Sequence, residues 1–134
     1  EYFDEDFFAY FEDVDVDWRS QLRGWKCLYV PTAIGYHMRG GTGLIKRPEI
    51  AACYLANRWL MLVKNDVVIH FFPDLWPFVW RFARDVYAYL RANPRALLFG
   101  VLRFATHFPT AWKKRRAIQR NRLTPLRYVR GLIR

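Results

Sequence analysis

The chain has 134 residues, of which 53% are hydrophobic and 19% aromatic, and it carries a formal net charge of +10. This length allows one modest hydrophobic core, and the composition excludes a disordered or fibrous protein. The two cysteines, Cys27 and Cys53, are too few and too widely spaced for a disulfide scaffold or a zinc knuckle, so we expect both to be reduced. No run of 18 residues is apolar and uncharged, which argues against a membrane-spanning helix.

Charge is divided unevenly along the chain. Residues 1–17 hold eight of the twelve acidic side chains and no basic one, so residues 18–134 carry a net charge of +18. No acid follows Asp85, whereas lysine and arginine crowd the C-terminal end. A basic tail of this kind favours phosphate groups, on a lipid surface or on nucleic acid.

Residues 3–15 are the most informative segment, because they place six carboxylates among bulky aromatic side chains. Burying a carboxylate is costly unless a metal, a basic partner or hydrogen bonds offset the cost. The segment is therefore either a solvated turn or a built site, and we interpret it as a site.

A helix is predicted directly after this segment, over residues 13–23. Val14, Trp18 and Leu22 recur every four residues, and Gly24 stands where a left-handed helix cap belongs. The N-terminus of this helix favours negative charge at Asp13. We expect the acids at positions 15 and 17 to be solvated or to cap the helix.

Two short strands are predicted next, over residues 25–30 and 33–36, and a glycine-rich loop follows over 38–43. Helices are predicted from Pro48 to about residue 65 and over 75–92, where apolar residues at spacings of three and four form one stripe and arginines flank it. Asn93-Pro94 should end the second of these helices. We expect one further helix over 95–106 and another from Pro109 onward.

Residues 1–65 resemble the end of the catalytic domain of family 2 inverting glycosyltransferases of the GT-A type, with the bacterial rhamnosyltransferase-like members nearest. The features that carry this resemblance are Glu12-Asp13 in an acidic-aromatic run, Arg23-Gly24-Trp25 after a helix, a strand ending at Pro31, and His37 before a glycine loop. The resemblance implies an α/β fold in which residues 1–47 are the C-terminal part of a GT-A (nucleotide-diphospho-sugar transferase) domain. Residues 48–134 would be an amphipathic, basic helical tail, so that most of this chain is helical.

The resemblance also implies roles for individual residues. Asp13 would be the general base that deprotonates the acceptor hydroxyl, and Glu12 would orient the acceptor or brace the loop. His37 would help to bind a divalent metal, Mg²⁺ or Mn²⁺, on the donor diphosphate. Arg39, Gly40 and Gly41 would close over that diphosphate.

Two motifs of the family are missing from this chain. Its Asp-x-Asp metal motif should lie upstream, and Asp13-Val14-Asp15 is not that motif. Since the chain also begins inside a dense motif without a Met, we expect it to be the C-terminal piece of a longer protein and to be inactive alone. The Gln-x-x-Arg-Trp motif of processive synthases is absent, which favours transfer of a single sugar over polymer synthesis.

The sequence therefore predicts a glycosyltransferase that moves a sugar from a nucleotide-sugar donor to a lipid-linked or polysaccharide acceptor, as in cell-wall polysaccharide biosynthesis. The cationic helix over 75–92 predicts peripheral attachment to an anionic membrane surface, on the cytoplasmic face of the cell membrane. One alternative is a non-catalytic module that binds a membrane or nucleic acid through the basic tail, although no nucleic-acid-binding motif is present and we expect no such partner. An inactive glycosyltransferase-like scaffold is a third possibility.

Overall fold

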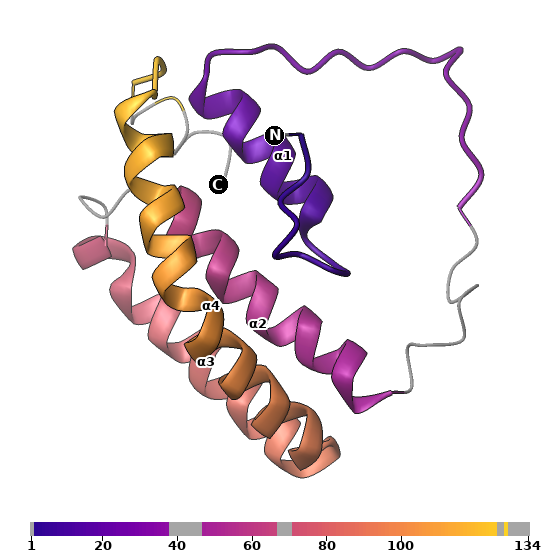
Figure 1. The fold of residues 1–134 in the computed structure, drawn as a ribbon, viewed down its shortest axis with the longest axis vertical. Coiled ribbons are helices and arrows are strands. Elements are labelled where there is room, and N and C mark those ends of the chain that lie inside the picture. The colour runs from indigo at the N-terminus through magenta and orange to yellow at the C-terminus, as the bar shows by residue number, and fades with distance from the viewer. Residues whose placement is uncertain (1, 38–46, 67–70, 126–127, 129–134) are drawn as a thin grey trace.

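The structure is a computed structural model that describes residues 2–37, 47–66, 71–125 and 128. Within these residues the chain forms four α-helices and no β-strand. The helices are α1 (Glu12–Leu22), α2 (Pro48–Asn65), α3 (Phe71–Ala92) and α4 (Pro94–Arg120). Figure 1 shows α1 lying beside α2 and α4, and α3 on the far side of α4 in that view.

The predicted α/β fold of a GT-A domain is wrong for the described part of the chain, which is entirely helical or irregular. Residues 25–30 and 33–36, predicted as strands, are extended but pair with no neighbour in that part. They arc away from the helices (Figure 1), and the side chain of Tyr36 is 98% exposed. A strand is stable only when a neighbouring strand satisfies its backbone groups and one face is buried, and the described residues provide neither condition.

Helix α1 ends at the glycine expected to cap it. Gly24 has a φ of +76°, in the left-handed region. The N–H of Trp25 donates to the C=O of Ser20, and the N–H of Gly24 donates to the C=O of Gln21, both over 3.0 Å. These two bonds form a Schellman motif, which satisfies carbonyls that the end of a helix otherwise leaves unpaired.

The centre of the molecule is the contact between α2 and α4, on which α1 and the N-terminal segment also pack. Ala56, Leu60 and Met61 of α2 meet Ala111 of α4 in a buried cluster that also includes Phe7. Burial of a side chain such as that of Leu60 contributes about 1.5–3 kcal/mol.

A glycine in α4 permits a close approach of the two central helices. A Cβ atom placed on Gly100 would stand 2.9 Å from Cδ2 of Leu55 and 3.5 Å from the carbonyl oxygen of Ala52, both in α2. Only a residue without a Cβ fits here without displacing its neighbours.

The break at Asn93-Pro94 is confirmed, but the break expected at Pro109 is wrong. Asn93 caps α4 by accepting a hydrogen bond from the N–H of Ala96 over 3.0 Å, and Pro94 follows at the first helical position. Helix α4 then continues through Pro109, which lies on its exposed side. A proline removes one helical hydrogen bond, and packing of the opposite face against α2 keeps the two halves of α4 in one helix.

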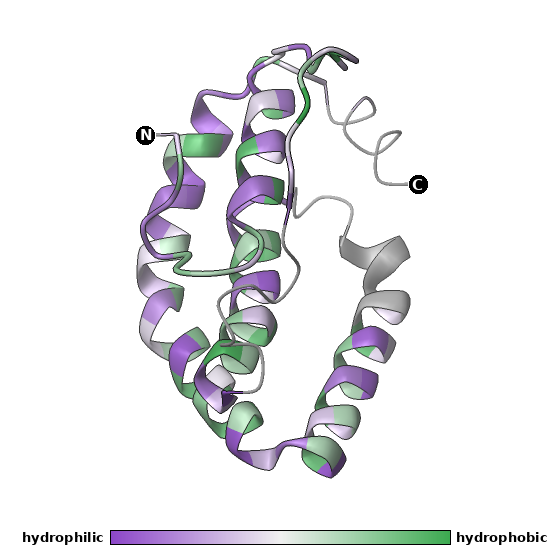
Figure 2. Ribbon diagram, turned by 90° about the vertical axis from the view of Figure 1, so that its right-hand side faces the viewer, coloured by the Kyte–Doolittle hydropathy of each residue, from purple (hydrophilic) through white to green (hydrophobic). Residues whose placement is uncertain are grey.

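Helix α3 contacts the rest of the molecule through one side only. The ring of Phe82 lies 4.9 Å from that of Trp59 in an edge-to-face arrangement, and Asp85 forms an ion pair with Arg58. From the bend at Asn93, α3 and α4 diverge (Figure 2). None of the described helices combines the length and the hydropathy that crossing a bilayer requires.

Candidate functional site

The acidic segment separates into a buried set of carboxylates and an exposed one. Asp4 and Asp15 are buried, and both bind the ammonium group of Lys64, which is itself only 1% exposed. The distance from Lys64 Nζ to Asp15 Oδ1 is 2.7 Å. Asn65 donates to the same oxygen over 2.6 Å. This arrangement satisfies a lysine and two carboxylates inside the fold, where an unpaired charge would be strongly destabilising.

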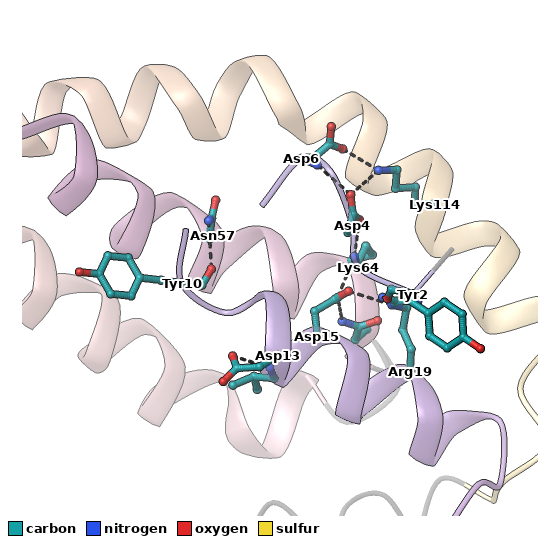
Figure 3. A network of polar contacts seen from close by, with 12 residues as sticks. Tyr2, Asp4, Asp6, Tyr10, Asp13, Asp15, Arg19, Asn57, Lys64 and Lys114 are labelled. Carbon is teal, nitrogen blue, oxygen red and sulfur yellow. Dashed lines mark hydrogen bonds and ion pairs between the residues drawn. The ribbon is translucent and has the colours of Figure 1, made fainter. Parts of the chain in front are cut away.

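Further cations complete this network at its edges (Figure 3). Arg19, one turn after Asp15 in α1, donates to Asp15 Oδ2 over 2.8 Å. Lys114 of α4 bridges Asp4 and Asp6, with 2.8 Å between Lys114 Nζ and Asp6 Oδ2. The network thus ties the N-terminal segment and α1 to both central helices. We call it the lysine network.

The lysine network makes the free energy of unfolding depend on pH in the acidic range. Burial alone would raise the pKa of the Asp4 carboxyl, but hydrogen bonds from Lys114 and Lys64 outweigh burial and lower this pKa from 3.8 to about 2. The folded state therefore binds the proton of Asp4 less readily than the unfolded chain does. The resulting stabilisation, about 2 kcal/mol, is present above the unfolded pKa and is lost as pH falls from about 4 to about 2.

This loss can be measured by urea unfolding across that pH range, with Asp4→Asn protein as the control. The variant lacks the titrating group, so its free energy of unfolding should fall less steeply with acid than that of the unchanged protein. Equal slopes for the two proteins would contradict the assignment to Asp4.

The turn before α1 holds a strained backbone. Tyr10 and Phe11 both have a φ of +68°, a conformation that is costly for bulky residues. The side chain of Asn57 in α2 donates to the carbonyl oxygens of Ala9, over 2.8 Å, and of Tyr10, over 3.1 Å. Arg103 of α4 donates to the carbonyl oxygen of the nearby Asp6. Side chains of two other helices therefore fix a turn that its own sequence would not adopt.

Aromatic contacts hold the same turn from a second direction. The ring of Tyr54 lies 5.6 Å from that of Tyr10 and 5.2 Å from that of Phe11. Such pairs contribute about 0.5–1.5 kcal/mol each beyond their area burial. Backbone strain that several surrounding contacts maintain is characteristic of functional sites. The residues that directly follow this strained turn are Glu12 and Asp13.

Asp13 differs from the buried acids. Its carboxylate is exposed, lies apart from the lysine network in Figure 3, and forms no ion pair with any described residue. Its only hydrogen bond in that part of the chain comes from the backbone N–H of Val14, over 2.8 Å. Glu12 is half-buried, and its Oε2 atom is buried without a hydrogen-bond partner among the described residues. The first turn of α1 thus offers one accessible carboxylate beside one sheltered carboxyl oxygen.

The other predicted site residues are not brought to this turn. His37 is exposed at the end of the extended segment, with no hydrogen bond or ion pair to another described residue. Arg39, Gly40 and Gly41 lie outside the described residues. In the part of the chain that the structure covers, no cluster of three potential metal ligands is found.

A cavity lies against α1, where Val16, Arg19 and Ser20 contribute to its wall. Its volume is about 340 Å³, and Asp4, Arg19, Lys64 and Lys114 of the lysine network contribute to its wall. Arg23 and Trp25 also line it, so among the charged lining side chains four are cationic and one is acidic. The charges of the lysine network are already paired with one another, and we assign this cavity no ligand.

The residues that hold the site together are not among those predicted from the sequence. Asp15, expected to be solvated or to cap the helix, is fully buried, whereas Asp17 is exposed. The sequence predicts no role for Asn57 or Lys64. Both recur at helical spacing with Cys53, Leu60 and Met61, on the apolar side of the predicted helix over 48–65. A lysine and an asparagine on a buried stripe indicate buried polar partners elsewhere in the chain.

Comparison of the chain with protein-family models, with curated proteins and with solved structures gives no match.

Proposed function

We propose that this chain carries the acceptor-activating carboxylate of an inverting sugar transferase that uses a nucleotide-sugar donor. The observation that carries the proposal is the exposed carboxylate of Asp13, free of any cation among the described residues and placed by a strained turn that α2 and α4 fix. The resemblance of residues 1–65 to family 2 glycosyltransferases supports the same role. The proposal concerns the reaction, and it does not require the sheet that was wrongly expected in this chain.

The chemistry of inverting transfer needs one base on the face of the sugar opposite the leaving diphosphate. Asp13 takes the proton of the acceptor hydroxyl as the oxygen attacks the anomeric carbon. A carboxylate held in a salt bridge would be a weaker base and would be blocked from the acceptor. Glu12 lies beside Asp13, but its Oε2 atom is buried without a partner among the described residues, so this oxygen would have to become accessible before it could accept a hydrogen bond from a second acceptor hydroxyl.

A divalent ion, Mg²⁺ or Mn²⁺, on the donor diphosphate is part of the proposal. Such an ion would supply Lewis-acid stabilisation of the leaving group when bound. Of the residues proposed to bind the metal and the donor diphosphate, the structure describes only His37. Its exposed imidazole, without a partner among the described residues, is available as a ligand. One nitrogen does not make a metal site, so further ligands would have to come from outside the described residues.

We also place the protein at the cytoplasmic face of the cell membrane, with an acceptor that is lipid-linked or a membrane-associated saccharide. Support comes from the basic C-terminal half and from the many large apolar side chains that α3 and α4 leave exposed. An enzyme acting on an acceptor that is confined to a surface benefits from binding that surface.

The proposal can be tested with full-length protein, nucleotide-activated sugars and membrane extracts that contain lipid-linked acceptors. We expect transfer of labelled sugar, with the configuration at the anomeric carbon of the product opposite to that of the donor, as read by NMR coupling constants. Retention of configuration, or no transfer from any donor, would contradict the proposal.

A further inference from the structure

Helix α3 exposes an aromatic stripe on the side that faces away from α2. Trp76, Trp80 and Tyr87 are separated by four and seven residues, a spacing that puts them on one face of a helix, and their side chains are 74%, 63% and 59% exposed. Val79 and Leu90 lie beside them and are also exposed. We call these five side chains the α3 stripe.

The α3 stripe overlaps only in part with the stripe predicted from the sequence, which consists of Leu75, Val79, Phe82, Val86 and Tyr89 or Leu90. Val79 and Leu90 belong to both stripes, whereas the ring of Phe82 contacts Trp59 of α2 and Val86 is half-buried. Asp85 of this helix forms an ion pair with Arg58 of α2. The inner side of α3 is therefore used in the fold, and a second, more aromatic side remains without a partner among the described residues.

Arginines border the α3 stripe. Arg84 and Arg91 stand seven residues apart on one edge, next to Trp80 and Tyr87. Arg91 donates to the hydroxyl of Tyr87 over 2.8 Å and lies 5.7 Å from its ring centre. Arg84 is largely exposed, and its contact with Asp85 is long at 3.7 Å. This edge of the α3 stripe thus places cationic groups next to its aromatic rings.

We propose that the α3 stripe lies flat in the headgroup region of an anionic bilayer, with Arg84 and Arg91 on lipid phosphates. This inference rests on the proposed attachment to the membrane and names the side chains that make it. Tryptophan and tyrosine favour the bilayer interface because their rings are apolar while the indole N–H and the phenol O–H remain hydrated. The chain's net charge of +10 complements anionic lipid.

A second copy of the chain is a poorer occupant of this face. In a two-fold symmetric dimer the same surface meets itself, so the arginine borders of both copies would approach each other. Two chains that each carry a charge of +10 also repel one another at long range. Anionic lipid removes both penalties.

The test is flotation of the 134-residue chain with vesicles of phosphatidylcholine, with and without phosphatidylglycerol. We expect binding to the anionic vesicles, and a partition coefficient lowered roughly tenfold or more by the triple variant Trp76→Ser/Trp80→Ser/Tyr87→Ser. The matched control is Trp25→Ser, because Trp25 is 61% exposed but lies outside α3. This control should bind like the unchanged chain.

A second variant tests the charged border separately. Arg84→Gln/Arg91→Gln should retain weak binding to phosphatidylcholine but lose roughly tenfold or more of the preference for phosphatidylglycerol. Far-UV circular dichroism checks that each variant keeps its helices. Equal flotation of the triple variant and the Trp25 control would overturn the proposal, and so would a concentration-dependent dimer that the triple variant abolishes.

Neither readout requires sugar transfer. Failure of flotation would therefore leave the role of Asp13 intact, and failure of the transferase assay would leave the α3 stripe intact.

Discussion

Replacement of Asp13 by asparagine is expected to lower the turnover of the full-length protein by about 10²- to 10⁴-fold, the contribution typical of a positioned general base. Asparagine keeps the size of the side chain and its ability to accept the hydrogen bond from the N–H of Val14, so the turn and α1 should persist. Donor binding should not change, because Asp13 acts on the acceptor. Single-turnover rates and the Kd of the nucleotide-sugar measure these two effects separately.

Asp17→Asn provides the matched control for that experiment. Asp17 is also an exposed acid of α1, one turn beyond Asp13. Its removal changes the net charge equally but should leave turnover nearly unchanged. Comparable losses in the two variants would assign the effect to charge or stability, and full activity of Asp13→Asn would remove the proposed role.

Replacement of Lys64 by methionine should cost about 3–5 kcal/mol of folding free energy. Methionine fills most of the volume of lysine but leaves Asp4 and Asp15 without the cation that lies between them. Both carboxylates are buried, so water cannot substitute for the ammonium group. The free energy of unfolding in urea measures this loss.

Lys113→Met is the control, because Lys113 is exposed on α4 and should change stability by no more than about 0.5 kcal/mol. The double variant Lys64→Met/Asp15→Asn should recover part of the loss, since it removes the charge of one of the two buried carboxylates that Lys64 binds. A loss below about 1 kcal/mol for Lys64→Met alone would show that the remaining cations compensate for it.

The sequence was a good guide to where helices begin and end. Gly24, Pro48 and Asn93-Pro94 are local signals, and each acts where it stands in the chain. Pro109 was a misleading signal, because the packing of α4 on α2 outweighs the loss of one hydrogen bond. Local preference predicts a boundary well only where tertiary contacts do not oppose it.

The strands and the ion pairs could not be predicted in this way. Residues 25–30 have the composition of a strand, but a strand also needs a partner, which composition cannot supply. Asp15 resembles Asp17 in sequence, and only the position of Lys64 on a helix 49 residues later makes one of them buried. The position of Asp13 outside the lysine network likewise depends on how the helices pack together. Its predicted catalytic role came from the resemblance alone.

The span of the lysine network has a consequence for the order of folding. The ion pair between Asp4 and Lys114 joins residues 110 positions apart, and closing a loop of that length costs about 4 kcal/mol in chain entropy. That cost must be met before the contact is formed, so helix pairing at α2 and α4 should precede docking of the N-terminal segment. Tyr10 and Phe11 would then reach their left-handed conformation last, and the region around Asp13 would be the first to open in the native state.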